Sequence, residues 1–291
     1  MATRVMTRAP ATLPLYARAV APLLPLASRL PFVAGGGGEL PALELVLEDA
    51  AADRGRLAAY AEVCGFTPGD ALPATYPHVL AFPLHMALMT DGRFPYGAAG
   101  LVHVANRITQ HRPIGAGEQL TLSVRAADAG PHPRGRAFTL LSQGCAGGEL
   151  VWEGASTMLR RGGGTGARHD REPGADGEPL VLGSQWHLRA DLGRRYAAVS
   201  GDRNPIHLSA PTAKLLGFPR AIAHGMWTKA RCLAALEGRL PEAFTVDVAF
   251  RRPILLPGRV AFASSAGDGA IRFAVRDPAG AHTHLEGTVA P

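Results

Sequence analysis

The chain has 291 residues, of which 47% are hydrophobic and 19% charged, and its formal net charge is +6. A chain of this length can bury a large core, either as one large domain or as two domains of about 140 residues. Of its 30 basic residues, 28 are arginines, and they form no run of five or more and do not alternate with aromatic residues. The composition therefore does not indicate a nucleic-acid-binding protein.

The cysteines and the N-terminal residues indicate the cellular compartment in which the protein is expected. The three cysteines are Cys64, Cys145 and Cys232. Because they are odd in number and lack C-x-x-C spacing, they indicate neither a disulfide framework nor a zinc site, and they fit a reducing cytoplasm. An apolar stretch over residues 9–27 follows two arginines, as in a signal peptide, but four prolines and Arg18 interrupt it. We therefore expect a cytoplasmic protein that begins with an irregular extension over residues 1–38.

Strand-like and helix-like patterns follow in the same order in each half of the chain. Residues 40–49 predict a strand and residues 50–64 a helix, because apolar positions recur there at helical spacing. In the second half, residues 184–189 predict a strand and residues 191–200 a helix. Each half continues with alternating segments that predict antiparallel strands. These strands are expected over residues 100–111, 118–128, 135–146 and 149–160, and again over 243–252, 258–266, 270–277 and 281–289.

The two halves are also similar in sequence. Residues 60–65 align with 196–201, and residues 101–113 align with 244–253, at offsets of 136 and 140. A repeat of this length indicates duplication of one domain. We place the domains at residues 39–160 and 181–291, joined by a polar, glycine-rich linker at 161–180. A helix followed by a meander of antiparallel strands, twice, predicts an α+β fold in which each sheet wraps around its own central helix.

The linker also contains a loose match to the dinucleotide-binding pattern. Gly162, Gly164 and Ala167 have the required spacing after a strand. However, no amphipathic helix follows, and no acidic residue lies about 20 positions further on, so we do not predict a nucleotide site.

The candidate chemistry lies in the stretch from Tyr196 to Trp227. It places Asp202, Asn204 and His207 within six residues, after Gly201, which can end a helix. Because Asn-Pro disfavours a helical continuation, residues 202–207 are predicted to form a tight loop. A carboxylate and an imidazole on one loop can reach the same water, as general acid–base catalysis near neutral pH requires.

A predicted helix begins 18 residues after His207, at His224-Gly225. The free N–H groups and positive dipole at a helix N-terminus can stabilise an oxyanion, and a glycine leaves room for a carbonyl oxygen to approach. The alternative interpretation is structural, because Asp, Asn and Pro are common in turns and His224 could be a core histidine.

Gly-Asp-Arg-Asn-Pro-Ile-His over residues 201–207, followed by Ala-His-Gly-Met, resembles the signature of the MaoC-like (R)-specific enoyl-thioester hydratases, or hydratase 2. In that family the residues matching Asp202 and His207 are the catalytic pair, and the residue matching Asn204 lies in the active site. The N–H matching Gly225 binds the thioester oxygen, and we include the adjacent His224 as a candidate for substrate binding.

The resemblance covers most of residues 40–291 and implies a double hot-dog fold, in which two copies of one domain form a pseudo-dimer within the chain. The two-copy layout further resembles the 3-hydroxyacyl-thioester dehydratases of actinobacterial lipid metabolism. That implies a medium-to-long acyl thioester of coenzyme A or of an acyl carrier protein, and neither a metal nor a redox cofactor. The net positive charge would attract either anionic carrier. Two such chains could also form a homodimer.

The first copy lacks the motif, since Phe66 occupies the position of Asp202. We expect its central helix, over residues 81–91, to be shortened and interrupted by Pro83 and Gly92, and to line a tunnel for the acyl chain. The tunnel candidates are Phe82, Leu84, Met86 and Ala87, with burial in the core as the alternative. Four other histidines in this copy are scattered in the sequence and are interpreted as structural. They are His78, His85, His103 and His111.

Three functions are considered from the sequence, and the intact motif favours the first. The first is reversible hydration of a trans-2-enoyl thioester to the (R)-3-hydroxyacyl thioester, with one active site per chain. The second is hydrolysis of an acyl thioester, because hot-dog folds also include thioesterases. The third is a non-catalytic acyl-thioester-binding subunit.

Overall fold

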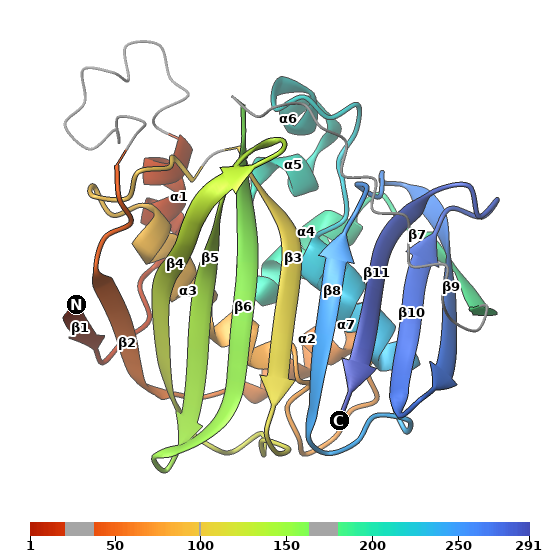
Figure 1. Cartoon of the computed structure of the whole chain (residues 1–291), viewed down its shortest axis with the longest axis horizontal. Helices are drawn as coiled ribbons and strands as arrows, with labels where there is room; N and C mark the ends of the chain where they lie inside the picture. The colour runs from red at the N-terminus through yellow and green to blue at the C-terminus, as the bar shows by residue number, and fades with distance from the viewer. Residues whose placement is uncertain (21–37, 99, 163–179) are drawn as a thin grey trace.

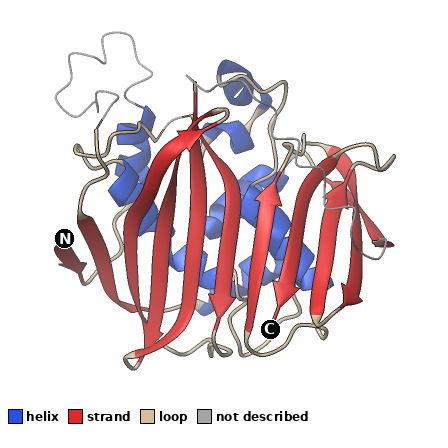
Figure 2. Ribbon diagram, viewed as in Figure 1, coloured by secondary structure: helices blue, strands red, loops and turns tan. Residues whose placement is uncertain are grey.

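The computed structural model describes residues 1–20, 38–98, 100–162 and 180–291. An eleven-stranded sheet forms one layer, and the helices pack behind it (Figures 1 and 2). The strand order is β1-β2-β4-β5-β6-β3-β8-β11-β10-β9-β7. The first six strands are β1 (Ala2–Met6), β2 (Leu43–Ala50), β3 (Leu101–Gln110), β4 (Leu120–His132), β5 (Gly135–Ala146) and β6 (Glu149–Arg161). The other five are β7 (Val181–Leu188), β8 (Phe244–Phe250), β9 (Gly258–Gly267), β10 (Ala270–Arg276) and β11 (Thr283–Ala290).

The helices follow the same two-part order. They are α1 (Thr12–Val20), α2 (Arg54–Cys64), α3 (Tyr76–Met89), α4 (Leu192–Ser200), α5 (Pro205–Leu208), α6 (Ala210–Leu215) and α7 (Gly225–Ala235). α3 lies behind the first half of the sheet and α7 behind the second (Figure 1). The strands and helices predicted from alternation and helical spacing are confirmed to within a few residues, because each pattern reflects which side chains face the core.

The two halves meet at a pseudo-twofold axis. β3 pairs antiparallel with β8, and Arg107 lies directly opposite Asp247, its equivalent in the sequence repeat. Tyr60 and Tyr196, also repeat equivalents, are buried with their ring centroids 6.1 Å apart. The double hot-dog prediction is therefore confirmed, with the two half-sheets joined edge to edge in one continuous sheet. Every neighbouring pair of strands is antiparallel except β1 with β2.

A buried lysine connects α7 to this junction. The side chain of Lys229 is fully buried, and its Nζ donates to Asn106 Oδ1 at 2.6 Å, to Asn106 O at 3.1 Å and to Val246 O at 3.0 Å. Burial lowers the pKa of Lys229 well below its ordinary value. Three acceptors offset the cost of burying the amine, and they hold α7 against β3 and β8.

The prediction that the central helix of the first copy is shortened and interrupted is wrong. α3 runs without a break over 14 residues and contains Pro83. Proline removes one helical hydrogen bond and costs about 3 kcal/mol in a helix interior. Ten residues of α3 are buried, so packing against the sheet outweighs that local cost.

The prediction of an irregular N-terminal extension is also wrong for residues 2–6 and 12–20. β1 extends the sheet by pairing with β2, and α1 contacts α3. Leu15 and Ala19, four residues apart, are buried on one face of α1, while Pro14 falls in the first turn, where a missing N–H removes no helical bond. The linker predicted at 161–180 lies outside the described residues except at its ends. Over the described ranges, no helix has both the length and the apolar character needed to cross a membrane.

Candidate active site

The backbone between α4 and α5 places Asp202 and His207 near each other. α4 ends at Gly201, whose φ of 80° lies in the left-handed region that favours glycine. Pro205 then begins α5, and Asn204 caps it by accepting the Ile206 N–H at 3.3 Å. The turn after Gly201 is thus confirmed, but His207 lies on a four-residue helix rather than in a loop. Asn204 has a structural task in addition to lining the cavity described below.

The Asp202 carboxylate has two donors on the same oxygen. Oδ1 accepts the Tyr16 hydroxyl at 2.9 Å and the Asn204 N–H at 3.1 Å. Burial raises the pKa of Asp202, but the neighbouring His224 and His207, the Asn204 N–H and the Tyr16 hydroxyl outweigh it and lower the pKa below its ordinary value. Asp202 is therefore an ionised carboxylate near neutral pH, with Oδ2 free of these donors.

Hydrogen bonding fixes the tautomer of His207. Its Nδ1 lies 2.8 Å from the carbonyl oxygen of Ile222, which can only accept, so Nδ1 carries the proton. Burial lowers the pKa of His207, although the Asp202 charge opposes this. The ring is therefore neutral, and its Nε2 carries a lone pair that can take a proton.

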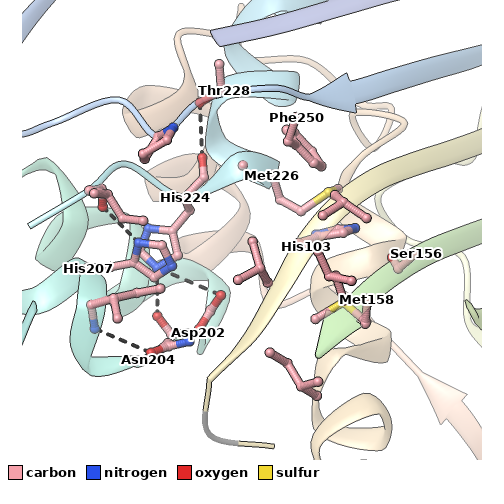
Figure 3. A pocket seen from close by; sticks show the side chains of 18 of the residues that line it. His103, Ser156, Met158, Asp202, Asn204, His207, His224, Met226, Thr228 and Phe250 are labelled. Carbon is pink, nitrogen blue, oxygen red and sulfur yellow. Dashed lines mark hydrogen bonds and ion pairs between the residues drawn. The ribbon is translucent and has the colours of Figure 1, made fainter. Parts of the chain in front are cut away.

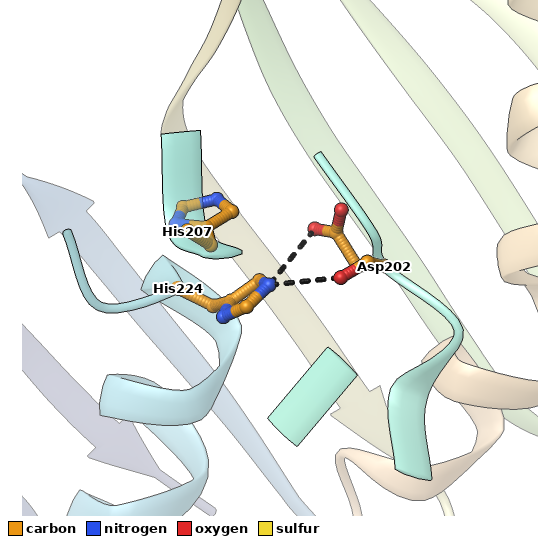
Figure 4. A group of neighbouring side chains, drawn as sticks. All are labelled: Asp202, His207 and His224. Carbon is orange, nitrogen blue, oxygen red and sulfur yellow. Dashed lines mark hydrogen bonds and ion pairs between the residues drawn. The ribbon is translucent and has the colours of Figure 1, made fainter. Parts of the chain in front are cut away.

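His224 supports the loop that carries Asp202. Its Nε2 donates to the main-chain oxygen of Asp202 at 3.0 Å and lies 3.9 Å from Oδ2 (Figure 4). The ring stacks on His207 with centroids 3.7 Å apart, and burial lowers the pKa of His224 to about 3. Nδ1 is buried without a hydrogen-bond partner among the described residues. The nitrogen of His224 that lies beside Asp202 is thus already engaged with the backbone.

Gly225 is the first residue of α7, where a backbone N–H has no acceptor within the helix and the dipole is positive. A Cβ added at this position would lie 3.0 Å from the ring of Phe250. Glycine therefore lets this aromatic ring pack closely against the helix N-terminus, and Gly225 lines the same cavity as Asp202 and His207.

A cavity of about 180 Å³ lies between the two halves. Asp202, Asn204, His207 and Gly225 line it from the second half. In Figure 3 Asp202, Asn204 and His207 lie on one side of the pocket and the labelled first-half residues on the other, with Met226 and Phe250 between them. The labelled first-half residues are His103, Ser156 and Met158. The site is therefore built from both copies, although only one copy carries the motif.

A second cavity of about 90 Å³ also reaches Asp202 and is lined mainly by apolar side chains. Among the tunnel candidates, Phe82 lines both cavities and Met86 lines the second. Leu84 and Ala87 line neither of these two cavities, because they lie on other faces of α3, where Leu84 is completely buried. For those two residues the alternative of burial against the core is correct.

Three of the histidines that look scattered in the sequence lie together. The rings of His78 and His85 on α3 are 5.0 Å apart, and His103 on β3 lies 6.3 Å from His78. Burial lowers the pKa of all three, to about 3 for His85 and about 4 for His103. These neutral rings form part of the wall of the larger cavity.

The side chains of Asp202, His207 and His224 have ligand atoms within 4.8 Å of one another, a spacing that a metal ion could bridge. These three side chains are not a suitable set of metal ligands. His224 Nε2 must keep its proton to donate to the Asp202 carbonyl, and a protonated nitrogen cannot bind a metal. The geometry instead suits a water molecule between Asp202 and His207.

Comparison with known proteins identifies the family. The MaoC-like domain matches residues 174–285. The chain is 37% identical to 3-hydroxyacyl-thioester dehydratase X of Mycobacterium tuberculosis over 274 residues. This alignment covers 94% of this chain and 95% of that protein. The chain belongs to the MaoC-like dehydratase family.

Solved structures agree with this fold. The crystal structure of HtdX of M. tuberculosis matches with a TM-score of 0.76 and 36% identity, covering 85% of this chain and 99% of that one. Another M. tuberculosis protein, described as having a double hotdog fold, matches with a TM-score of 0.54 and 13% identity over 88% of this chain and 96% of that one. At that identity the similarity concerns the fold alone.

Tyr16 is the site residue that sequence reasoning missed. The helical spacing of Leu15 and Ala19 could have indicated α1. Nothing in the sequence indicates that this helix contacts a carboxylate 186 residues away.

Proposed function

We propose that this chain catalyses the reversible addition of water to a trans-2-enoyl thioester, giving the (R)-3-hydroxyacyl thioester, in fatty-acid metabolism. One observation carries the proposal. Asp202, whose pKa is lowered, His207, whose Nε2 has no hydrogen-bond partner among the described residues, and Gly225 at the N-terminus of α7 line one cavity. The dehydratase named among the family relatives supports the same reaction class.

In the hydration direction, the thioester oxygen accepts the Gly225 N–H, which draws electron density from the double bond. A water held between Asp202 and His207 attacks Cβ. The pair takes one proton from that water and delivers one to Cα, while the π electrons of the double bond form the new Cα–H bond. Dehydration is the reverse. The reaction adds one water molecule and involves no net oxidation or reduction.

The acyl chain has an apolar path next to this chemistry. Phe82, Met89, Leu101 and Met158 line both cavities, so a chain that leaves Asp202 can enter the smaller, apolar one. Each buried methylene contributes about 0.8 kcal/mol. We propose that the first copy, without a carboxylate at Phe66, selects chain length while the second copy performs catalysis.

Finer points of the proposal concern the carrier, the assembly and the compartment. The carrier is coenzyme A or an acyl carrier protein, two chains associate as a homodimer, and the protein is cytoplasmic. The carrier is tested by comparing the coenzyme A and acyl-carrier-protein thioesters of one acyl group. The homodimer is tested by light scattering, and the compartment by fractionating cells that produce the protein.

The purified protein should be incubated with crotonyl- and dodecenoyl-coenzyme A while enoyl absorbance and free thiol are followed. We expect absorbance to fall without thiol release, and dodecenoyl-coenzyme A to be the better substrate. Release of thiol would indicate a thioesterase, and binding without either change would indicate a non-catalytic subunit. One tight-binding inhibitor per chain is expected; two would contradict the single site.

A further inference from the structure

The hydroxyl of Tyr16 lies between two groups of the catalytic loop. It donates to Asp202 Oδ1 at 2.9 Å and accepts the Arg203 N–H at 2.7 Å. The backbone N–H can only donate, so the hydroxyl proton must point to the carboxylate. A hydrogen bond to an ionised acceptor is about twice as strong as a neutral one.

The helix that carries Tyr16 is firmly seated. Leu15 and Ala19 are buried in the core of the first half, and β1 extends the sheet just before the helix. Tyr16 and Ala19 also line the smaller cavity together with Asp202. The N-terminal segment is therefore both a wall of that cavity and a partner of the carboxylate.

We propose that Tyr16 is a positioning residue for Asp202, so that the N-terminal segment completes the active site of the second half. This inference rests on the proposed function. With Tyr16 and the Asn204 N–H both on Oδ1, the carboxylate is held in one orientation, and Oδ2 is the oxygen left for the water and its proton. Without the hydroxyl, the carboxylate loses a donor that stabilises its charge and gains freedom to rotate.

A purely structural role would be to fasten α1 to the loop. The two roles differ in what they change. Fastening affects stability and the cavity wall, whereas positioning also affects turnover and the pH at which Asp202 becomes protonated.

The test compares Tyr16→Phe with Leu15→Ala in the full-length protein. Tyr16→Phe should lower kcat on crotonyl-coenzyme A by about 10- to 100-fold, the range expected for one hydrogen bond to a charged group, with KM changed by less than about threefold. The acid limb of its kcat/KM profile should move to higher pH, because a carboxylate with one donor fewer is protonated more readily. Leu15→Ala loosens the helix but keeps the hydroxyl, so it should lower the melting temperature and leave the acid limb in place.

A wild-type pH profile in Tyr16→Phe, or the same loss and shift in Leu15→Ala, would overturn the inference. A second readout does not require activity. In protein with ¹³C-labelled aspartate carboxyl groups, the Asp202 signal, assigned by its absence in Asp202→Asn, should titrate at higher pH in Tyr16→Phe than in the wild type. An unchanged titration would refute the role of Tyr16. A wild-type protein inactive on every enoyl thioester would count against the proposed function alone.

Discussion

Replacing Asp202 with asparagine tests the proposed chemistry most directly. Asparagine has nearly the same shape, and its Oδ1 can still accept the Tyr16 hydroxyl and the Asn204 N–H, so the loop should keep its conformation. What changes is the second oxygen, which becomes an NH₂ group that cannot take a proton from water. A positioned acid or base contributes about 10²–10⁴-fold to the rate, which corresponds to roughly 2.7–5.4 kcal/mol of transition-state stabilisation. We expect kcat to fall by that factor.

The assay is hydration of crotonyl-coenzyme A, followed by the loss of enoyl absorbance, with melting temperature and inhibitor binding measured in parallel. His207→Gln should lower kcat by a similar factor, and the double variant should be no slower than the slower single variant if the pair acts as a unit. Asp202→Asn with kcat within tenfold of the wild type, at unchanged melting temperature, would refute the assignment of the pair. Additive losses in the double variant would show instead that the two side chains act independently.

Three further outcomes are expected. Gly225→Pro, which removes the N–H, should be a further 10²–10³-fold slower than Gly225→Ala, which adds a Cβ but keeps the N–H; equal rates would exclude this N–H from catalysis. Ala98→Leu, which fills the smaller cavity, should lower kcat/KM on dodecenoyl-coenzyme A but not on crotonyl-coenzyme A. Ala87 lines neither cavity, so Ala87→Leu should leave kcat/KM on both substrates unchanged. The melting temperature should fall as the pH drops from 7 to 5, because buried histidines with lowered pKa values bind protons only after unfolding. Each such histidine lowers the free energy of unfolding by about 1.4 kcal/mol per pH unit, and a constant melting temperature would contradict this. The histidines with the largest such shifts include His85, His103 and His224.

Local patterns in the sequence determined the architecture and the motif. Strands were predictable because side chains alternate between the two faces of a sheet, and the duplication was visible as offsets of 136 and 140 residues. Asp202, Asn204 and His207 could be proposed together because they lie within six residues, so that one turn is enough to bring them close.

Only the tertiary structure decided what surrounds that motif. The contact of Tyr16 with Asp202 spans 186 residues, and no local pattern encodes a contact between a helix at one end of the chain and a loop near the other. Which residues of α3 face the cavity depends on how the helix is rotated against the sheet, so Phe82 lines it while Ala87 does not. The continuity of α3 through Pro83 also depends on tertiary packing. Packing of a buried helix outweighs a local preference of a few kcal/mol, and that packing exists only once the sheet has formed.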